Sequence, residues 1–329
     1  MLEVTLSTPV LYLFLFLSGL LWAGLGLAYK IADHQRCRTG SFSRVFMLNA
    51  GVICGIAALF DRQTVWGDGR LWVLALAAGL LFYLVILILM PTYRLGPPSV
   101  VWIVVNLGVL VPIFLSPLFH EPLYWYLDPL LFGLFILMLL AFQRGMAQAS
   151  ETNKASRWLF LAALLAVLIT NGVLLTGPKL QHLLFGDHGR WAYLTVFYGI
   201  SALFTLVVDL FRRDSLRPTA WEWKAGLLAG TSGAVGMVFF MLAMTLPAAV
   251  VYSINGGFSL LGGVVLTTLI YHERMNPMKF AGLLLGTLVL LGAVLREPLV
   301  KQLQRMPALH TMTAQPLTHH GQTSEKSAQ

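Results

Sequence analysis

The sequence predicts an all-α integral membrane protein in which ten transmembrane helices form two inverted five-helix repeats. Three observations lead to this prediction. The composition is 57% hydrophobic and only 11% charged. Ten apolar runs of membrane-spanning length follow one another, separated by short polar segments. A His-Glu pair ends an apolar run at His120-Glu121 and again at His272-Glu273, 152 positions later.

The composition argues against a soluble globular protein, because such proteins average roughly 25% charged residues. A chain this apolar, with a mean hydropathy of +0.76, could not cover its own surface in water. The net charge of +8 lies in loops between apolar runs, which is typical of a membrane surface and not of a nucleic-acid interface. Cys37 and Cys54 have no partner at metal or redox spacing. We therefore expect no metal, no cofactor and no nucleic acid, with the lipid bilayer as a partner.

Each expected span is an apolar run close to the roughly 20 residues that cross a bilayer core. Several runs begin or end on Trp or Tyr, which favour the headgroup level. The first run is too long for a signal peptide, and Glu3 precedes it without any Lys or Arg, so we expect this run to be retained. In order, the ten spans are Pro9–Tyr29, Arg44–Phe60, Leu71–Pro91, Pro97–Phe119, Leu123–Phe142, Trp158–Thr176, Trp191–Phe211, Trp223–Thr245, Pro247–Tyr271 and Phe280–Leu295.

The third to fifth spans resemble the eighth to tenth. RLGPPSVVWIVVN (94–106) matches TLPAAVVYSIN (245–255), and LFHEPLYW (118–125) matches IYHERMNPMKF (270–280). Because five is odd, the second copy enters the membrane from the opposite side, and a site is expected at the midplane between the halves. The His-Glu pairs then recur because the unit recurs, and we interpret them as turns between paired helices, with a catalytic or coupling role as the alternative. The predicted domains are residues 1–150, residues 151–298 and a polar, disordered tail, residues 299–329.

These features resemble the ten-helix, EamA-like branch of the drug/metabolite transporter (DMT) superfamily. The resemblance covers residues 9–296 and includes Trp22-Ala23-Gly24, LPAAVVYSINGGFSLLGGVV (246–265) and a Glu directly after the fourth and ninth spans. It implies a carrier whose central cavity is built by spans one, three, four, six, eight and nine. It implies no particular substrate. The turn in this family is commonly Gly-Glu, whereas His precedes Glu at both positions here.

Ionisable residues inside a span are costly and therefore suggest function, but the spans here are nearly free of them. We expect Asp209 to form an ordinary surface pair with Arg212 and Arg213, three and four residues later. Lys30 and Lys179 either reach the membrane interface or take part in a gate. Glu121 and Glu273 are candidates for the rim. Without a midplane carboxylate, a neutral or zwitterionic metabolite is the expected substrate.

Uncharged polar and aromatic residues at mid-span depth are the candidates for substrate binding. Asn106 and Asn255 occupy equivalent positions in the two halves. The complete set is Trp22, Trp102, Asn106, Asn171, Tyr252 and Asn255. Packing between helices is the alternative role for each of them. Gly230, Gly233 and Gly236 predict a close helix approach, with a sliding hinge as the alternative.

A secondary transporter in the plasma (inner) membrane is the function that these features favour. A non-transporting scaffold or receptor is the first alternative, although it would not need an inverted repeat. An intramembrane enzyme is the second, but neither HEPLY nor HERMN supplies the second His of an H-E-x-x-H metal site. The sequence leaves open whether the protein is a monomer or a homodimer.

The distribution of basic residues predicts the orientation of the chain. With ten spans, loops and ends on the side of the termini carry eight of the 22 Lys and Arg, and the other side carries fourteen. Since Lys and Arg resist translocation, the charge count predicts that both termini lie outside. The family resemblance implies instead that both lie inside.

Overall fold

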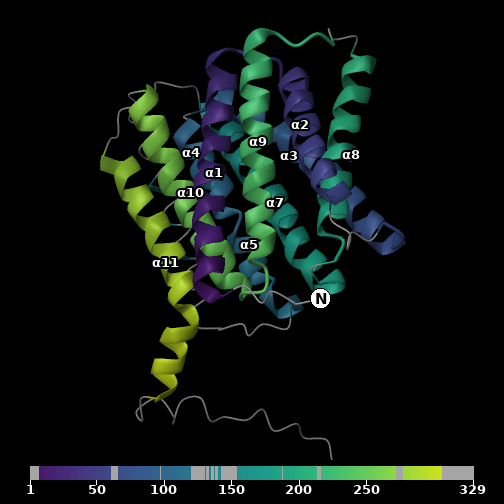
Figure 1. The fold of residues 1–329 in the computed structure, drawn as a ribbon. Helices are drawn as coiled ribbons and strands as arrows, with labels where there is room; N and C mark the ends of the chain where they lie inside the picture. The colour runs from purple at the N-terminus through teal and green to yellow at the C-terminus, as the bar shows by residue number, and fades with distance from the viewer. Residues whose placement is uncertain are drawn as a thin grey trace, which may run out of the picture. The chain divides into compact units, whose positions relative to one another are not determined.

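The structure, a computed structural model of the chain, describes residues 7–60, 66–96, 98–119, 130, 133, 134, 137, 140, 141, 154–186, 188–212, 216–271 and 277–305. Every regular element in this part of the chain is a helix, which agrees with the predicted all-α class (Figure 1). Residues 1–294 form one compact unit, and residues 295–329 form a second, small one.

Helices follow one another from end to end of the described chain. Before residue 120 they are α1 (Thr8–His34), α2 (Thr39–Phe60), α3 (Gly69–Leu95), α4 (Pro98–Leu107), α5 (Leu110–Phe114) and the 3-10 helix η1 (Ser116–Phe119). After residue 150 they are α7 (Lys154–Phe185), α8 (Arg190–Phe211), α9 (Ala220–Leu242), α10 (Ala248–Tyr271) and α11 (Pro277–Arg305). Among the described residues, six helices are long and apolar enough to cross a membrane: α1, α2, α3, α7, α8 and α9. These six helices indicate a membrane-embedded protein.

The expected fourth span, Pro97–Phe119, is not one continuous helix. α4 ends at Leu107, and Gly108 and Val109 form a turn in which each N–H donates to the carbonyl three residues earlier, at 3.1 and 3.3 Å. Pro112 contributes to the break, because a proline inside a helix has no N–H to donate and its ring clashes with the carbonyl four residues before it, here that of Gly108. Proline alone is not sufficient, since Pro91 and Pro178 lie inside the continuous helices α3 and α7. The matching segment of the second half, α10, is continuous in the structure.

Two other expectations concern the ends of the helices. α11 continues to Arg305, so residues 299–305, which we expected to begin a disordered tail, are helical. Most of the expected fifth span, Leu123–Phe142, lies outside the described residues. So do both His-Glu turns, including the rim candidates Glu121 and Glu273.

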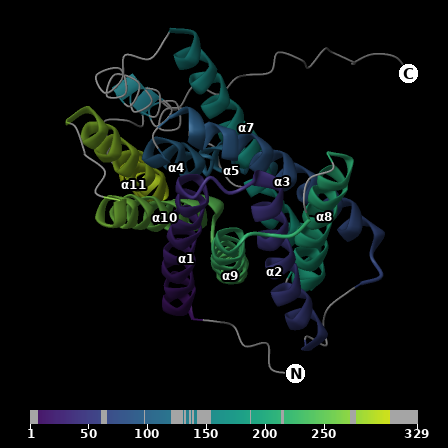
Figure 2. The same cartoon turned by 90° about the horizontal axis from the view of Figure 1, so that it is seen from above.

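The helices of the two halves interleave instead of forming two separate bundles. α1 packs on α9 and α10, and α7 packs on α3, α4 and α5. α2 packs on α8 and α9, and α3 packs on α8. Figure 2 shows α9 lying between α1 and α2. These contacts correspond in pairs between the two halves of the chain: α1 on α9 corresponds to α7 on α3, and α2 on α9 corresponds to α8 on α3. In the same way, α1 on α10 corresponds to α7 on α4 and α5, and the contact between α2 and α8 corresponds to itself.

Three of the glycines of α9, Gly230, Gly233 and Gly236, allow this close approach. A Cβ at Gly230 would lie 2.7 Å from the Phe46 carbonyl oxygen of α2, and one at Gly236 would lie 2.5 Å from the Trp22 indole of α1. At Gly233 the nearest atom, from the Phe46 ring, would be 3.1 Å away. The close helix approach predicted from the spacing of these glycines is therefore confirmed.

Candidate functional site

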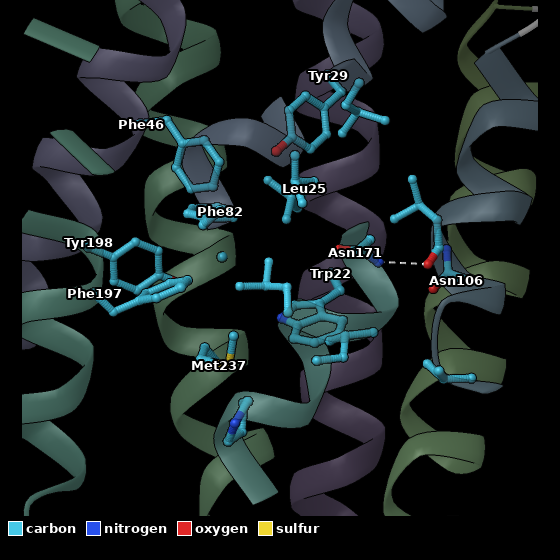
Figure 3. Close-up of a pocket in the computed structure, with 18 of the residues that line it drawn as sticks. Trp22, Leu25, Tyr29, Phe46, Phe82, Asn106, Asn171, Phe197, Tyr198 and Met237 are labelled. Atoms are coloured by element: carbon cyan, nitrogen blue, oxygen red, sulfur yellow. Dashed lines mark hydrogen bonds between the residues drawn. The ribbon is translucent and has the colours of Figure 1, made fainter. Parts of the chain in front are cut away.

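A cavity lies where helices from both halves meet. Its described lining comes from α1, α2, α3 and α4 of the first half and from α7, α8 and α9 of the second. About 80 Å³ of it is open to the centres of water-sized molecules, which is several times the roughly 10–15 Å³ that one water needs. Figure 3 shows side chains of the two halves facing each other across this space.

Aromatic rings from α2, α3 and α8 form one wall of the cavity (Figure 3). The ring of Phe82 stacks on that of Phe197 with centroids 5.0 Å apart, and Phe46 meets Phe82 edge-on at 5.6 Å. Tyr198 packs edge-on against Phe197 at 4.7 Å. Contacts between rings of α2, α3 and α8 therefore hold this aromatic wall together.

α1 contributes Trp22 and Tyr29, which are both labelled in Figure 3. The Trp22 ring packs on Phe240, with centroids 5.1 Å apart, and lies against Gly236, where a Cβ would collide with it. Tyr29 stacks on Tyr93 at 5.9 Å. A glycine of α9 therefore determines where the Trp22 indole of α1 can lie.

Two amides face the aromatic wall from α4 and α7. Asn106 Nδ2 donates to the Trp102 carbonyl of its own helix at 2.8 Å. Asn171 Nδ2 donates across to the Val105 carbonyl at 2.9 Å (Figure 3). The Val105 carbonyl also accepts the turn bond from Gly108, so Asn171 of the second half is tied to the end of α4 beside its break. We refer to Asn106 and Asn171 as the amide wall.

No charged side chain occurs among the described residues that line the cavity. The two lysines named as gate or rim candidates are both buried, Lys30 at 7% and Lys179 at 6% exposure. Lys179 Nζ lies 3.2 Å from the Leu246 carbonyl and 3.4 Å from that of Met244, just beyond the end of α9. Its ammonium group there donates to backbone carbonyls of the segment that joins α9 to α10.

Of the six substrate-binding candidates, Trp22, Asn106 and Asn171 line the cavity, and Trp102, Tyr252 and Asn255 do not. The Trp102 indole packs over Gly26 and Gly263 and donates from Nε1 to the Ser259 carbonyl at 3.2 Å. Tyr252 donates its hydroxyl to the Leu175 carbonyl at 2.6 Å.

Asn255 is fully buried, and within the described residues neither atom of its amide has a hydrogen-bond partner. Its own backbone carbonyl lies close to Gly19, where a Cβ would be 2.8 Å away. This part of α10 therefore packs tightly against α1, at a place that is separate from the cavity.

The expectation that Asp209 lies at the surface is wrong, and Arg213, one of its two expected partners, lies outside the described residues. Asp209 is 4% exposed, and its carboxylate accepts a hydrogen bond from Arg44 Nη1 of α2. The physical reason is packing: the last turn of α8 lies against the first turns of α2, so Asp209 points into the helix interface. Arg44 also donates to the Leu216 carbonyl at 2.8 Å.

A second buried carboxylate at the same end of the bundle escaped the sequence analysis. Glu222, at 1% exposure, lies in the first turn of α9 and closes a capping box with Thr219. Arg38 binds it through Nε and Nη2, both at 2.9 Å, and Ser41 donates to it at 2.9 Å. A sequence signal existed, since Thr219 and Glu222 have capping-box spacing. We refer to Arg38–Glu222 and Arg44–Asp209 as the inter-half ion pairs.

No protein-family model matches the chain, and no curated protein matches it. The fold, in contrast, is similar to those of 26 chains of solved structures. One of them, a protein whose crystal structure is known, is similar with a TM-score of 0.62 over 87% of this chain and 96% of its own length, at 16% sequence identity. This likeness concerns the fold alone, and the function must be argued from the site.

Proposed function

We propose that the protein is a secondary transporter that moves a small neutral or zwitterionic metabolite across the membrane by alternating access. The observation that carries the proposal is the position of the cavity, between helices of the first half and helices of the second. A site held between two halves opens to one side or the other when the halves move relative to each other.

The chemistry of the lining supports a substrate without net charge. Aromatic rings and two amides surround the space, and its described lining contains no carboxylate, ammonium or guanidinium group. An unpaired charge placed there would lose its hydration without gaining a counter-ion. A polar but neutral molecule could keep hydrogen bonds to Asn106 and Asn171.

The proposal includes two inverted five-helix repeats of the EamA-like, drug/metabolite transporter type in the plasma (inner) membrane. Its support is that helix contacts correspond between the two halves of the chain: α1 packs on α9 as α7 packs on α3, and α2 packs on α9 as α8 packs on α3. Repeats that can adopt each other's conformation give an inward-open and an outward-open state of similar energy.

The test is solute flux in liposomes that contain the purified protein. A panel of labelled neutral and zwitterionic metabolites is offered, and we expect saturable uptake of at least one, accelerated by the same compound unlabelled inside. A transporter whose binding site returns across the membrane with substrate bound gives this counterflow, whereas a receptor or scaffold does not. If no compound on the panel enters faster than into protein-free liposomes, the proposal fails.

A matched pair of variants links the flux to the cavity. Leu174→Trp places an indole into the cavity, whereas Val173→Trp, one residue earlier in α7 at a position that is 45% exposed, places it on the outer surface. We expect the first variant to lose uptake and the second to retain it, at equal abundance and equal elution from a sizing column. Loss of uptake in both variants would leave the flux without a demonstrated link to this cavity and would contradict the expectation.

A further inference from the structure

The amide wall carries unused hydrogen-bonding groups of the cavity. Asn106 and Asn171 each donate one amide N–H to a backbone carbonyl, and they make no other hydrogen bond within the described residues. A side-chain amide has two N–H donors and an oxygen with two lone pairs. Each amide therefore keeps an oxygen and one N–H with which it can bind a ligand.

The opposite wall offers ring faces and edges, together with the hydroxyl group of Tyr198. Phe46, Phe82, Phe197 and Tyr198 lie together across the cavity from Asn106 and Asn171 (Figure 3). Aromatic rings bind other rings by offset stacking or edge-to-face contact, with centroids roughly 4.5–7 Å apart. A ligand that satisfies both walls has a flat apolar face on one side and a polar edge on the other.

The size of the cavity and the charge of its lining narrow the class of ligand further. About 80 Å³ of the cavity is open to water-sized molecules, compared with roughly 150 Å³ for a cavity that binds benzene. The ligand is therefore no larger than a single small ring. An organic cation could also lie against ring faces, but no carboxylate in the described lining is present to balance its charge.

We infer that the cavity selects an uncharged, planar, single-ring heterocycle that carries a hydrogen-bond donor and an acceptor side by side on its edge. This inference rests on the transport function proposed above and specifies its substrate class. The ring packs against Phe82 and Phe197, and its edge exchanges hydrogen bonds with the free N–H and oxygen of Asn106 and Asn171.

The test is direct binding to the purified full chain in detergent, measured by titration calorimetry. Uracil and 2-pyridone are the ring probes. Three analogues each change one feature: dihydrouracil loses the aromatic face, 1,3-dimethyluracil loses the N–H donors, and orotate adds a negative charge. We expect at least one ring probe to bind and the analogues to bind roughly tenfold more weakly, since one lost hydrogen bond alone is worth about two- to tenfold.

Matched variants separate recognition from packing. Asn171→Leu removes the free amide atoms and the bond to Val105, whereas Asn49→Leu removes an amide that likewise donates to a carbonyl of another helix, Leu227 at 3.0 Å, outside the cavity. We expect the ring probe to bind Asn171→Leu roughly tenfold more weakly and Asn49→Leu unchanged. Should Asn171→Leu fail to fold, Phe197→Leu with Phe204→Leu as its control tests the aromatic wall, because Phe204 stacks on Tyr83 away from the cavity.

The outcomes distinguish this inference from the proposed function. Ring binding without flux in liposomes would uphold the substrate class and overturn transport. Flux of an aliphatic metabolite with no binding of either ring probe would uphold transport and overturn the substrate class. Binding of tetramethylammonium in place of the rings, or equal binding of uracil and dihydrouracil, would also overturn it.

Discussion

Arg44 and Asp209 are buried between α2 and α8, and each is the charge partner of the other. We predict that Asp209→Asn lowers the free energy of unfolding by about 3–5 kcal/mol, because removal of one partner leaves the other as an uncompensated buried charge. The measurement is reversible unfolding in mixed micelles. The double variant Arg44→Met/Asp209→Leu should recover much of the loss, since neither buried charge remains.

Asp68→Asn is the control for that prediction. Asp68 pairs with Arg70 at 3.1 Å on the surface, where the Arg70 side chain is 81% exposed. Asparagine can replace aspartate as the N-cap of α3, so the substitution removes only the exposed charge pair. We expect little change in stability. An equal loss of unfolding free energy in Asp68→Asn and Asp209→Asn would contradict the prediction that the buried ion pair matters more than the exposed one.

Cys37 lies in the turn between α1 and α2 and is 3% exposed. Burial raises the pKa of its thiol, and the nearby Glu222 carboxylate raises that pKa further. Because the thiolate is the reactive form, maleimide labelling of the native protein should begin at a higher pH than labelling of the SDS-unfolded protein. A Cys54→Ser background makes Cys37 the only thiol. A native pH profile at or below the unfolded one would contradict this prediction.

Depth in a span was enough to nominate residues for the cavity but not to decide which of them reach it. Trp22, Asn106 and Asn171 line the cavity, whereas Asn255, the sequence equivalent of Asn106, is buried away from it. The position of a residue along a helix follows from the sequence, but the face it presents depends on rotation and on local breaks. The partner of Asp209 was missed for a similar reason, since it lies on a helix 165 positions away.

At the scale of the element, apolar runs predicted where helices occur but not whether they are continuous. Hydropathy counts apolar residues, and the stretch around Gly108 and Pro112 is as apolar as its neighbours. Backbone chemistry contributes to the break, because Pro112 cannot donate to Gly108. Close contact reinforces it: a Cβ at Gly172 of α7 would lie 3.0 Å from the Gly108 oxygen, so the two backbones cross closely.

The contact between α3 and α8 gives a prediction at the same scale. A Cβ at Gly79 would lie 2.7 Å from the Phe197 carbonyl oxygen, a backbone atom that can move only if the helices separate. We expect Gly79→Ala to lower the free energy of unfolding by about 1–3 kcal/mol, as overpacking does. The substitution should also weaken ligand binding, because Phe82 and Phe197 form the aromatic wall.

Gly199→Ala in α8 is the matched control, since a Cβ at this position meets nothing within 4 Å. In a helix alanine is favoured over glycine by about 1 kcal/mol, so we expect equal or slightly higher stability. Unfolding of both variants in mixed micelles provides the comparison. A destabilised Gly199→Ala together with an unchanged Gly79→Ala would show that the helices are not packed as described.

At the scale of the whole molecule, the charge count and the family resemblance predict opposite orientations. The segment after the first span contains Lys30, Arg36, Arg38 and Arg44, and no Lys or Arg precedes that span. We predict that this segment is cytoplasmic and that both termini lie outside. A C-terminal alkaline phosphatase fusion should then be active, because this enzyme works only when exported. An inactive fusion, together with an active cytoplasmic reporter at the same site, would reverse the assignment.

The inter-half ion pairs also bear on how the chain is made. Asp209 is translated 165 residues after Arg44, and Glu222 is translated 184 residues after Arg38. At a synthesis rate of roughly 5–20 residues per second, each arginine waits about ten to thirty seconds or more for its carboxylate. During that interval the first hairpin carries unneutralised guanidinium groups, which must stay in contact with water or lipid headgroups. The first hairpin can therefore settle at its final depth only after the ribosome has completed the start of α9.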